Sequence, residues 1–220
     1  MPPRGRAAVN AAEGLVRSAL AAGVDRCFAQ PGIAELPLLA ALDTVPGMRA
    51  TLGLCGGVCA AAADGYARMS GRPALTLLPL GPGFASGIAN FHNARRARSP
   101  VLNVVGEHAS WHRAADPLLA LDIASLARPV SSWLARCDSA ETLAEAAAEA
   151  IAAARRGGVA TLIVPHDVQL APATGLARPP RPAPPPAPSA PAVEAAAALL
   201  RRPGPAALYL GGAGLGVRGL

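Results

Sequence analysis

One strand–helix–strand unit occupies residues 74–105, whose sequence is ALTLLPLGPGFASGIANFHNARRARSPVLNVV. Two short apolar runs, Ala74–Leu78 and Val101–Val105, have the length and continuous hydrophobicity of strands that are covered on both faces. Between them, Gly81-Pro82-Gly83 predicts a tight loop, and Gly87–Arg98 predicts a helix that ends before a proline. Because strands joined by a crossover helix run parallel, this stretch predicts an α/β fold.

The same alternation of elements extends in both directions through residue 168. The expected helices are residues 10–24, Glu35–Leu42, Val58–Ser70 and Ala140–Arg156, and the further expected strands are Val24–Ala29, Met48–Leu54 and Val159–Val164. We therefore predict a parallel sheet with helices on both faces. Ligands of such sheets bind outside the carboxyl ends of the strands. Those ends are Gln30-Pro31-Gly32, Cys55-Gly56-Gly57, Pro79–Gly83 and Gly106-Glu107-His108.

The composition of the 220 residues excludes several classes of protein. Hydrophobic residues make up 52% of the chain, but no stretch of about 18 strongly apolar residues predicts a membrane span. No apolar segment follows the first arginines, so we expect no secretory signal and a cytoplasmic protein. The net charge of +6 comes from scattered arginines without interleaved aromatic residues, which argues against nucleic acid as a partner.

Four cysteines, Cys27, Cys55, Cys59 and Cys137, raise the question of a metal site. Cys55 and Cys59 have a spacing that a zinc knuckle can use, but no second Cys or His pair lies at ligand spacing. We therefore expect no metal site. The cysteines are expected to be small buried hydrophobic residues in a reducing compartment.

The C-terminal part of the chain differs from the rest. Prolines crowd residues 171–191, which predicts an extended linker that forms neither helix nor sheet. After it, the sequence predicts a helix over Ala192–Arg202, a strand over Ala206–Leu210 and a glycine-rich loop over Gly211–Gly219. We expect residues 1–170 to form one domain and residues 192–220 to form the truncated start of a second, Rossmann-like domain.

Several motifs, in order along residues 10–170, resemble the thiamine-diphosphate-dependent enzymes, a family that includes acetolactate synthase and benzoylformate decarboxylase. They are the Pro31-Gly32 turn, the Ala63-Asp64-Gly65-Tyr66-Ala67-Arg68 run, Gly81-Pro82-Gly83 with the helix from Asn90, and Val164-Pro165-His166-Asp167-Val168. The resemblance implies that residues 1–170 are the domain that binds the aminopyrimidine of thiamine diphosphate. It also implies a magnesium-dependent cofactor site between two subunits, and hence dimers.

The resemblance places eight residues of this chain at the cofactor. They are Pro31, Gly32, Gly56, Pro79, Gly81, Pro82, Gly83 and Asn90. In the family, a glutamate after the second strand hydrogen-bonds the pyrimidine nitrogen, which lets the cofactor generate its ylid. Gly56 stands at that position and has no side chain, so we predict no catalytic residue in this chain.

Further polar positions of the family are also apolar here. Pro79 stands where close relatives have a histidine, and Ile33 where some relatives have a serine. The chain has no G-D-G motif for magnesium and diphosphate, so we expect poor cofactor binding by this chain alone. Glu35 has two interpretations: it orients substrate or cofactor, or it is a solvated carboxylate in the first turn of a helix, where the helix dipole favours it. We expect the second.

The predicted function is that of the N-terminal domain of an acetolactate synthase-like or 2-oxo-acid decarboxylase-like enzyme. Such a domain would bind the aminopyrimidine at a dimer interface and be inactive alone. Two alternatives remain: a non-catalytic paralogue that forms a homodimer or a heterodimer with a full-length relative, and a truncated gene product. Whether the chain is an enzyme, and which substrate its family member uses, stay open at this stage.

Overall fold

The computed structural model of the chain describes residues 9–173, 177 and 187–212. The chain divides into two compact units, Met1–Pro182 and Ala183–Leu220. Within the described ranges, no helix has the length and apolar character needed to cross a bilayer.

The first unit contains six strands in one sheet, in the order β2-β1-β3-β4-β6-β5, and every neighbouring pair is parallel. The strands are β1 (Arg26–Ala29), β2 (Arg49–Leu52), β3 (Ala74–Leu78), β4 (Val101–Glu107), β5 (Trp133–Arg136) and β6 (Val159–Pro165). The predicted parallel α/β sheet is confirmed. Strand order reverses between β1 and β3, which makes this point the expected location of a ligand site.

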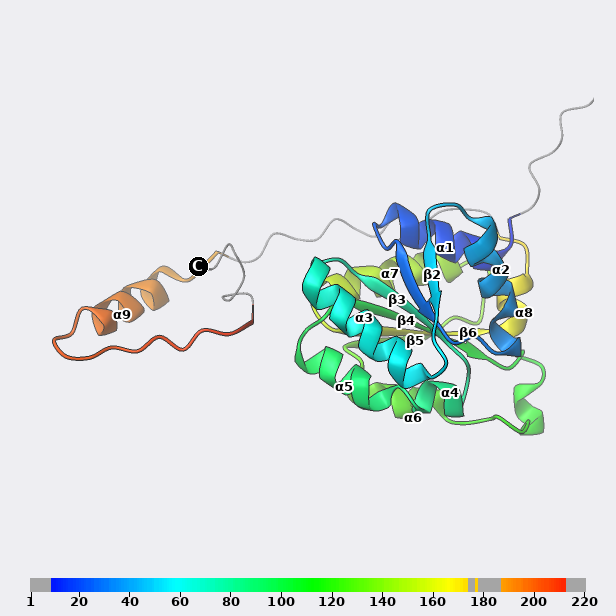
Figure 1. Cartoon of the computed structure of the whole chain (residues 1–220). Coiled ribbons are helices and arrows are strands. Elements are labelled where there is room, and N and C mark those ends of the chain that lie inside the picture. The colour runs from blue at the N-terminus through cyan, green and yellow to red at the C-terminus, as the bar shows by residue number, and fades with distance from the viewer. Residues whose placement is uncertain (1–8, 174–176, 178–186, 213–220) are drawn as a thin grey trace, which may run out of the picture. The chain divides into compact units, whose positions relative to one another are not determined.

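Helices cover both faces of the sheet (Figure 1). The main ones in this unit are α1 (Ala11–Ala21), α2 (Leu36–Thr44), α3 (Gly56–Ser70), α5 (Ile88–Arg96) and α7 (Leu143–Arg155), with the short helices α4 (Pro82–Ala85), α6 (Ile123–Ala127) and α8 (His166–Leu170). Buried side chains of α1, α2 and α7 form one hydrophobic core, and those of α3, α5 and α6 form the other. The sheet thus separates two cores built mainly from alanine and aliphatic residues.

Several predicted elements need correction. Gly81-Pro82-Gly83 is not only a loop, because Pro82 begins the short helix α4, where the missing N–H of proline costs nothing. β5 and α6 were not predicted. They have only four and five residues, respectively, which is too short to show a clear period of hydrophobic residues. β4 continues to Glu107, two residues beyond its predicted end.

A polar ladder crosses the centre of the sheet and was also not predicted. Thr76 Oγ1 donates to Asn103 Oδ1 over 2.8 Å, and Asn103 Nδ2 donates to Thr161 Oγ1 over 3.1 Å. The three residues pair in register across β3, β4 and β6, and all are fully buried. Their mutual hydrogen bonds remove the cost of burying them in an apolar sheet.

The second unit contains the helix α9 (Ala190–Leu200), which confirms the helix predicted over Ala192–Arg202. It begins two residues earlier than predicted, so the last two residues of the predicted linker are helical, contrary to the expectation of no helix there. The strand predicted over Ala206–Leu210 is wrong: these residues are exposed and pair with no other strand in the described part of the chain. An apolar run becomes a strand only when a neighbour supplies its backbone hydrogen bonds. Most of the predicted glycine-rich loop, residues 213–219, and most of the linker lie outside the described residues. One linker residue, Pro172, forms an antiparallel bridge with Asn10, contrary to the expectation of no sheet pairing.

Candidate functional site

The candidate site lies at the carboxyl edge of the sheet, where the turns after β1, β3 and β4 come together. The turn after β1 leads into the short 3-10 helix η1 (Ile33–Glu35), and the turn after β3 leads into α4. These two turns flank the point between β1 and β3 at which the strand order reverses.

Glu35 joins these two turns. The backbone N–H of Gly32 donates to Glu35 Oε2 over 2.8 Å, and the N–H of Leu80 donates to Oε1 over 3.3 Å. The Glu35 side chain is fully buried, so the expected solvated carboxylate is wrong. The helix begins only after Glu35, at Leu36, and the short 3-10 turn directs the carboxyl group inward instead of outward.

Burial raises the pKa of Glu35 to about 7, although its hydrogen bonds from the N–H groups of Gly32 and Leu80 act in the opposite direction. The neighbouring strand leaves room for this carboxyl group only because it carries glycine. A Cβ atom on Gly106 would overlap the Glu35 carboxylate. A glycine inside a buried strand is a known signal of close approach, and it could have indicated a buried partner here.

Gly56 lies in an equally crowded place at the start of α3. A Cβ atom on Gly56 would overlap the carbonyl oxygen of Gly83 and lie 2.6 Å from Ser86 Oγ. Ser86 Oγ in turn donates to that carbonyl over 2.7 Å, which holds the two groups in place. The turn after β3 therefore fills the space that a side chain at position 56 would need.

Several residues of the predicted cofactor site are neighbours in the structure. A Cβ atom on Gly32 would lie 3.2 Å from Pro79 Cβ, and one on Gly83 would lie 3.1 Å from the same atom. Gly83 also faces Gly56, as described above. The structure thus brings together Gly32, Gly56, Pro79 and Gly83 from three different segments.

The other predicted residues take different places. Asn90 Nδ2 donates to the carbonyl of Gly57 over 2.8 Å, so its amide ties α5 to the first turn of α3. Gly81 has a φ of +60° and packs against the backbone of Leu119. Pro82 is exposed at the start of α4, and Pro31 is partly buried in the turn before Gly32.

Two polar groups near Gly56 were missed by the sequence analysis. The atom Oε1 of Gln30 is buried, has no hydrogen-bond partner among the described residues, and lies 3.4 Å from the Cβ position of residue 56. Cys55 is exposed, so the expectation that all four cysteines are buried is wrong for this one, whereas Cys27, Cys59 and Cys137 are buried. The backbone N–H of Gly57, together with Ser86 and the N–H of Val58, holds the pKa of the Cys55 thiol below its ordinary value.

Residues of the Ala63–Arg68 run hold helix α3 in place by hydrogen bonds to neighbouring segments. Asp64 accepts hydrogen bonds from Ser99 Oγ over 2.5 Å and from Arg68, and Tyr66 donates to Asp25 over 3.2 Å. These contacts fix α3 to the segments before β1 and β4. Within the described residues, no group of three or more His, Cys, Asp or Glu side chains could hold a metal ion.

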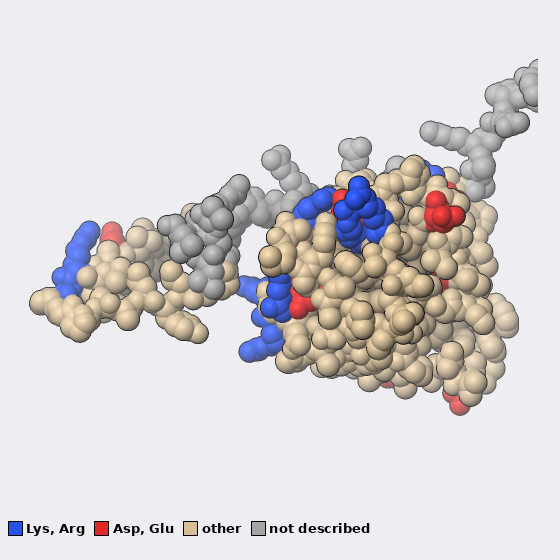
Figure 2. Space-filling view, viewed as in Figure 1, with Lys and Arg blue, Asp and Glu red and all other residues tan. Residues whose placement is uncertain are grey.

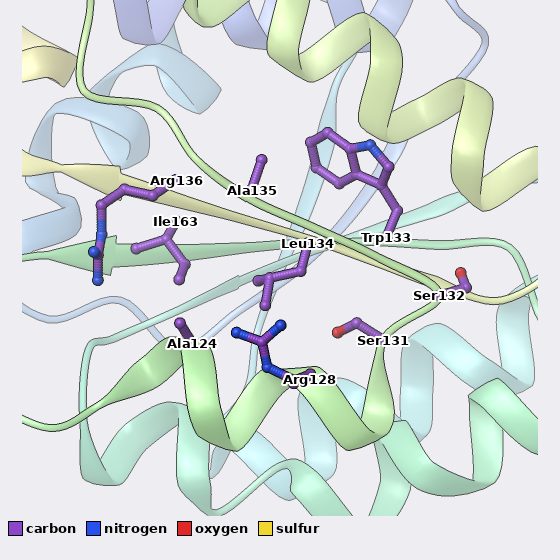
Figure 3. Close-up of a pocket in the computed structure, with 9 residues that line it drawn as sticks. All are labelled: Ala124, Arg128, Ser131, Ser132, Trp133, Leu134, Ala135, Arg136 and Ile163. Atoms are coloured by element: carbon purple, nitrogen blue, oxygen red, sulfur yellow. The ribbon is translucent and has the colours of Figure 1, made fainter.

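A concavity of about 450 Å³ lies elsewhere, beside the edge strand β5 (Figure 3). Leu134 and Arg136 point from β5 toward Ala124 and Arg128, while Trp133 points to the other side of the strand. None of the residues predicted for the cofactor line this concavity. It is therefore separate from the candidate site.

Comparison with known families agrees with this geometry. Residues 9–126 match the family model described as thiamine pyrophosphate enzyme, N-terminal TPP binding domain. The chain belongs to this family. The matched residues include β1 to β4 and hence every turn of the candidate site, so the resemblance seen in the sequence motifs is confirmed.

Individual members of the thiamine pyrophosphate enzymes are similar to most of the chain. IlvX of Mycobacterium tuberculosis, named as an acetolactate synthase large subunit, is 51% identical over 161 residues, which are 73% of this chain and 31% of the relative. A benzoylformate decarboxylase of Pseudomonas aeruginosa is 32% identical over 154 residues, 69% of this chain and 29% of the relative. The chain therefore spans about a third of the length of these relatives.

Solved structures share the fold. A thiamine diphosphate-dependent 4-hydroxybenzoylformate decarboxylase of Rhodococcus jostii aligns with a TM-score of 0.68 at 24% identity, over 93% of this chain and 35% of the other. A Mycobacterium smegmatis protein described as thiamin diphosphate-dependent aligns with a TM-score of 0.71 at 24% identity, over 80% of this chain and 34% of the other.

The burial of Glu35 predicts a specific dependence of stability on pH. The unfolded chain releases the Glu35 proton near 4.5 and the folded chain near 7, so the folded state binds more protons between these values. The free energy of unfolding should therefore fall as the pH rises through this window, by about 3 kcal/mol at 1.36 kcal/mol for each pH unit.

Urea unfolding at a series of pH values, with wild type and Glu35→Gln side by side, measures this effect. The fall should be absent in Glu35→Gln, because glutamine does not titrate, while all other titratable groups are the same in the two proteins. An equal fall in the two proteins would show that Glu35 is not the group responsible.

Proposed function

We propose that this chain forms the N-terminal domain of an acetolactate synthase-like or 2-oxo-acid decarboxylase-like protein, and that the domain does not activate thiamine diphosphate by itself. The family and the domain type are established by the match over residues 9–126. The observation that carries the rest of the proposal is the crowding around Gly56.

The family resemblance implies that the carboxyl edge of the sheet binds the aminopyrimidine. The residues present at this edge do not fit that role. Thiamine diphosphate, with magnesium, supplies a carbanion for carbon–carbon bond cleavage or formation beside a carbonyl group. The family resemblance implies that most members use a carboxylate against the pyrimidine ring for that chemistry. Gly56 cannot provide one, and the carbonyl of Gly83 and hydroxyl of Ser86 fill the adjacent space. Glu35, the carboxyl group nearby, is already engaged by two backbone N–H groups.

A glutamate at position 56 would not by itself supply the missing group. Its Cβ atom would require the turn around Gly83 to move, since backbone atoms stand in its place. The backbone of this turn, as well as the missing side chain at position 56, therefore stands against a glutamate at this place.

The expected activity of the purified chain with thiamine diphosphate, magnesium and pyruvate or benzoylformate is none above background. The test is consumption of the 2-oxo acid, with and without a metal chelator, in wild type and in Gly56→Glu. Turnover by the wild type that the chelator abolishes would contradict the proposal. Turnover by Gly56→Glu alone would contradict the structural account of the crowded turn.

A second candidate function is that of a non-catalytic partner in a homodimer, or in a heterodimer with a full-length relative. Exposed apolar side chains around the candidate site support it: Ile33, Leu52, Leu54, Val58 and Leu118, of which Leu54 is 91% and Leu118 99% exposed. They follow β1, end or follow β2, lie in the first turn of α3 or belong to the segment after β4, so they belong to the same edge of the sheet. Apolar side chains gathered in this way are typical of an interface between proteins.

Sedimentation velocity tests this candidate. At about 0.1 mM protein, a concentration at which even a dimer with a micromolar Kd is mostly assembled, the wild type should be a dimer. The Leu54→Asp/Val58→Asp variant should be a monomer, because charges would be buried in the interface. Met69→Asp is the matched control, since Met69 is 89% exposed but lies in the last turn of α3, at the opposite edge. A monomeric wild type, or equal dissociation of Met69→Asp, would contradict the candidate.

A further inference from the structure

The amino edge of the sheet, opposite the candidate site, concentrates the positive charge of the first unit. Its arginines lie at the starts of β1 and β2 and at the ends of α3, α5 and α7: Arg26, Arg49, Arg68, Arg72, Arg95, Arg96, Arg98, Arg155 and Arg156. The described acidic residues at this edge are Asp25, Asp43 and Asp64. Figure 2 shows blue side chains gathered on the side of this unit where α3 and α5 end.

A hollow of about 340 Å³ lies within this basic edge. It is lined by Gly23, Gly71, Arg72, Pro73, Pro100 and Arg155. These residues come from the turn before β1, the turn between α3 and β3, the segment before β4 and the end of α7. The volume is that of a site for a small molecule.

Two guanidinium groups converge at this hollow. Arg72 Nη2 donates to the carbonyl of Gly23 over 3.4 Å and pairs with Asp25 Oδ2 at 3.0 Å. Arg155 Nη2 donates to the carbonyl of Ala22, and it lies 3.7 Å from the Cβ position of Gly23. Both groups therefore lie against the same turn. Their Nε and Nη1 donors have no hydrogen-bond partner in the part of the chain that the structure describes.

A third arginine, Arg98, does not line the hollow but lies close to two segments that do. Arg98 is two residues before Pro100, and its side chain runs along Gly157, with Nε 3.7 Å from the Cβ position of that glycine. Arg98 has a φ of +57°, a left-handed conformation that is uncommon for arginine. No described carboxylate pairs with it.

The ends of helices account for part of this arrangement. A cation near a helix C-terminus interacts favourably with the helix dipole, which accounts for the exposed Arg95 and Arg96 in the last turn of α5. The carbonyl groups of Ala22 and Gly23 at the end of α1 likewise attract Arg155 and Arg72. These contacts use the Nη2 donors alone, and the two positive charges still repel each other at one turn, where Asp25 pairs with Arg72. An anion between them would remove that repulsion.

We propose that this hollow binds a small anion that carries phosphoryl groups. Arginine donates paired hydrogen bonds to phosphate oxygens, and two guanidinium groups at one hollow suit an anion with three or more tetrahedral oxygens better than a carboxylate with two. Nucleic acid is the less favoured occupant, because no aromatic side chain lines the hollow for base stacking. The site lies at the opposite edge of the sheet from Gly56 and does not depend on the proposed function.

Isothermal titration calorimetry of the whole chain with tripolyphosphate at low salt tests this site. The wild type should bind one equivalent in a saturable manner. Arg72→Gln/Arg155→Gln should weaken binding at least about tenfold, since two charge-assisted contacts are lost. Arg128→Gln is the matched control, because Arg128 is exposed and lines the separate concavity beside β5. It removes one positive charge, as each substitution of the double variant does, and should change the affinity by less than about twofold.

Circular dichroism checks that each variant folds, since Arg72 also pairs with Asp25. Should the double variant not fold, Arg155→Gln alone should weaken binding about threefold without loss of a described ion pair. Absence of saturable binding by the wild type, or equal weakening in Arg128→Gln, would overturn the proposal. So would citrate that binds as tightly as tripolyphosphate, or a short DNA duplex that, per phosphate group, binds more tightly than tripolyphosphate.

Discussion

The carboxyl group of Glu35 connects the two turns on which the carboxyl edge of the sheet depends. It accepts hydrogen bonds from the N–H groups of Gly32 and Leu80, which belong to the turns after β1 and β3. Without this acceptor, the buried N–H of Leu80 would lack the hydrogen bond that it makes there, at a cost of about 1 to 3 kcal/mol. Because the strand order reverses between β1 and β3, the same carboxyl group also occupies the place where a ligand is expected in such sheets.

The neighbouring segments are adapted to this buried carboxyl group. Gly106 leaves space for it in β4, and the turn after β3 continues past Pro79 to the carbonyl of Gly83 beside Gly56. The segments around position 56 are thus packed so closely that this position requires glycine, and a glutamate there would not fit without a shift of the turn. The chain keeps the fold of the thiamine pyrophosphate enzymes, and Gly56 stands at the position where the family resemblance implies a glutamate.

The fold could be predicted from sequence because its signals are local and repeated. Continuous apolar runs such as Ala74–Leu78 match β3 residue for residue, and the motifs around Ala63–Arg68 placed the chain in its family. The short elements β5 and α6 carry too few residues to show a period. The apolar run Ala206–Leu210 shows the opposite failure, since it has the composition of a strand but no neighbour to pair with in the described chain.

The candidate site was predicted less well, because its properties depend on contacts between distant segments. The positions of Gly32, Gly56, Pro79 and Gly83 follow from the family motifs, and the structure does bring them together. The burial of Glu35 depends on how the chain turns over three residues and on a glycine 71 positions later in sequence, at Gly106. Likewise, the exposure of Cys55 follows from its place at the start of α3, where its sulfur faces N–H groups of the first helical turn.

The central claim is that Glu35 is a buried carboxyl group held between two backbone N–H groups. Carbon-13 NMR of the Glu35 side-chain carboxyl, recorded across pH together with the amide protons of Gly32 and Leu80, tests it most directly. The account predicts a midpoint at a pH of about 7, shared by the carboxyl carbon and both amides. A midpoint near the ordinary value of 4.5, or amides that do not respond, would contradict it.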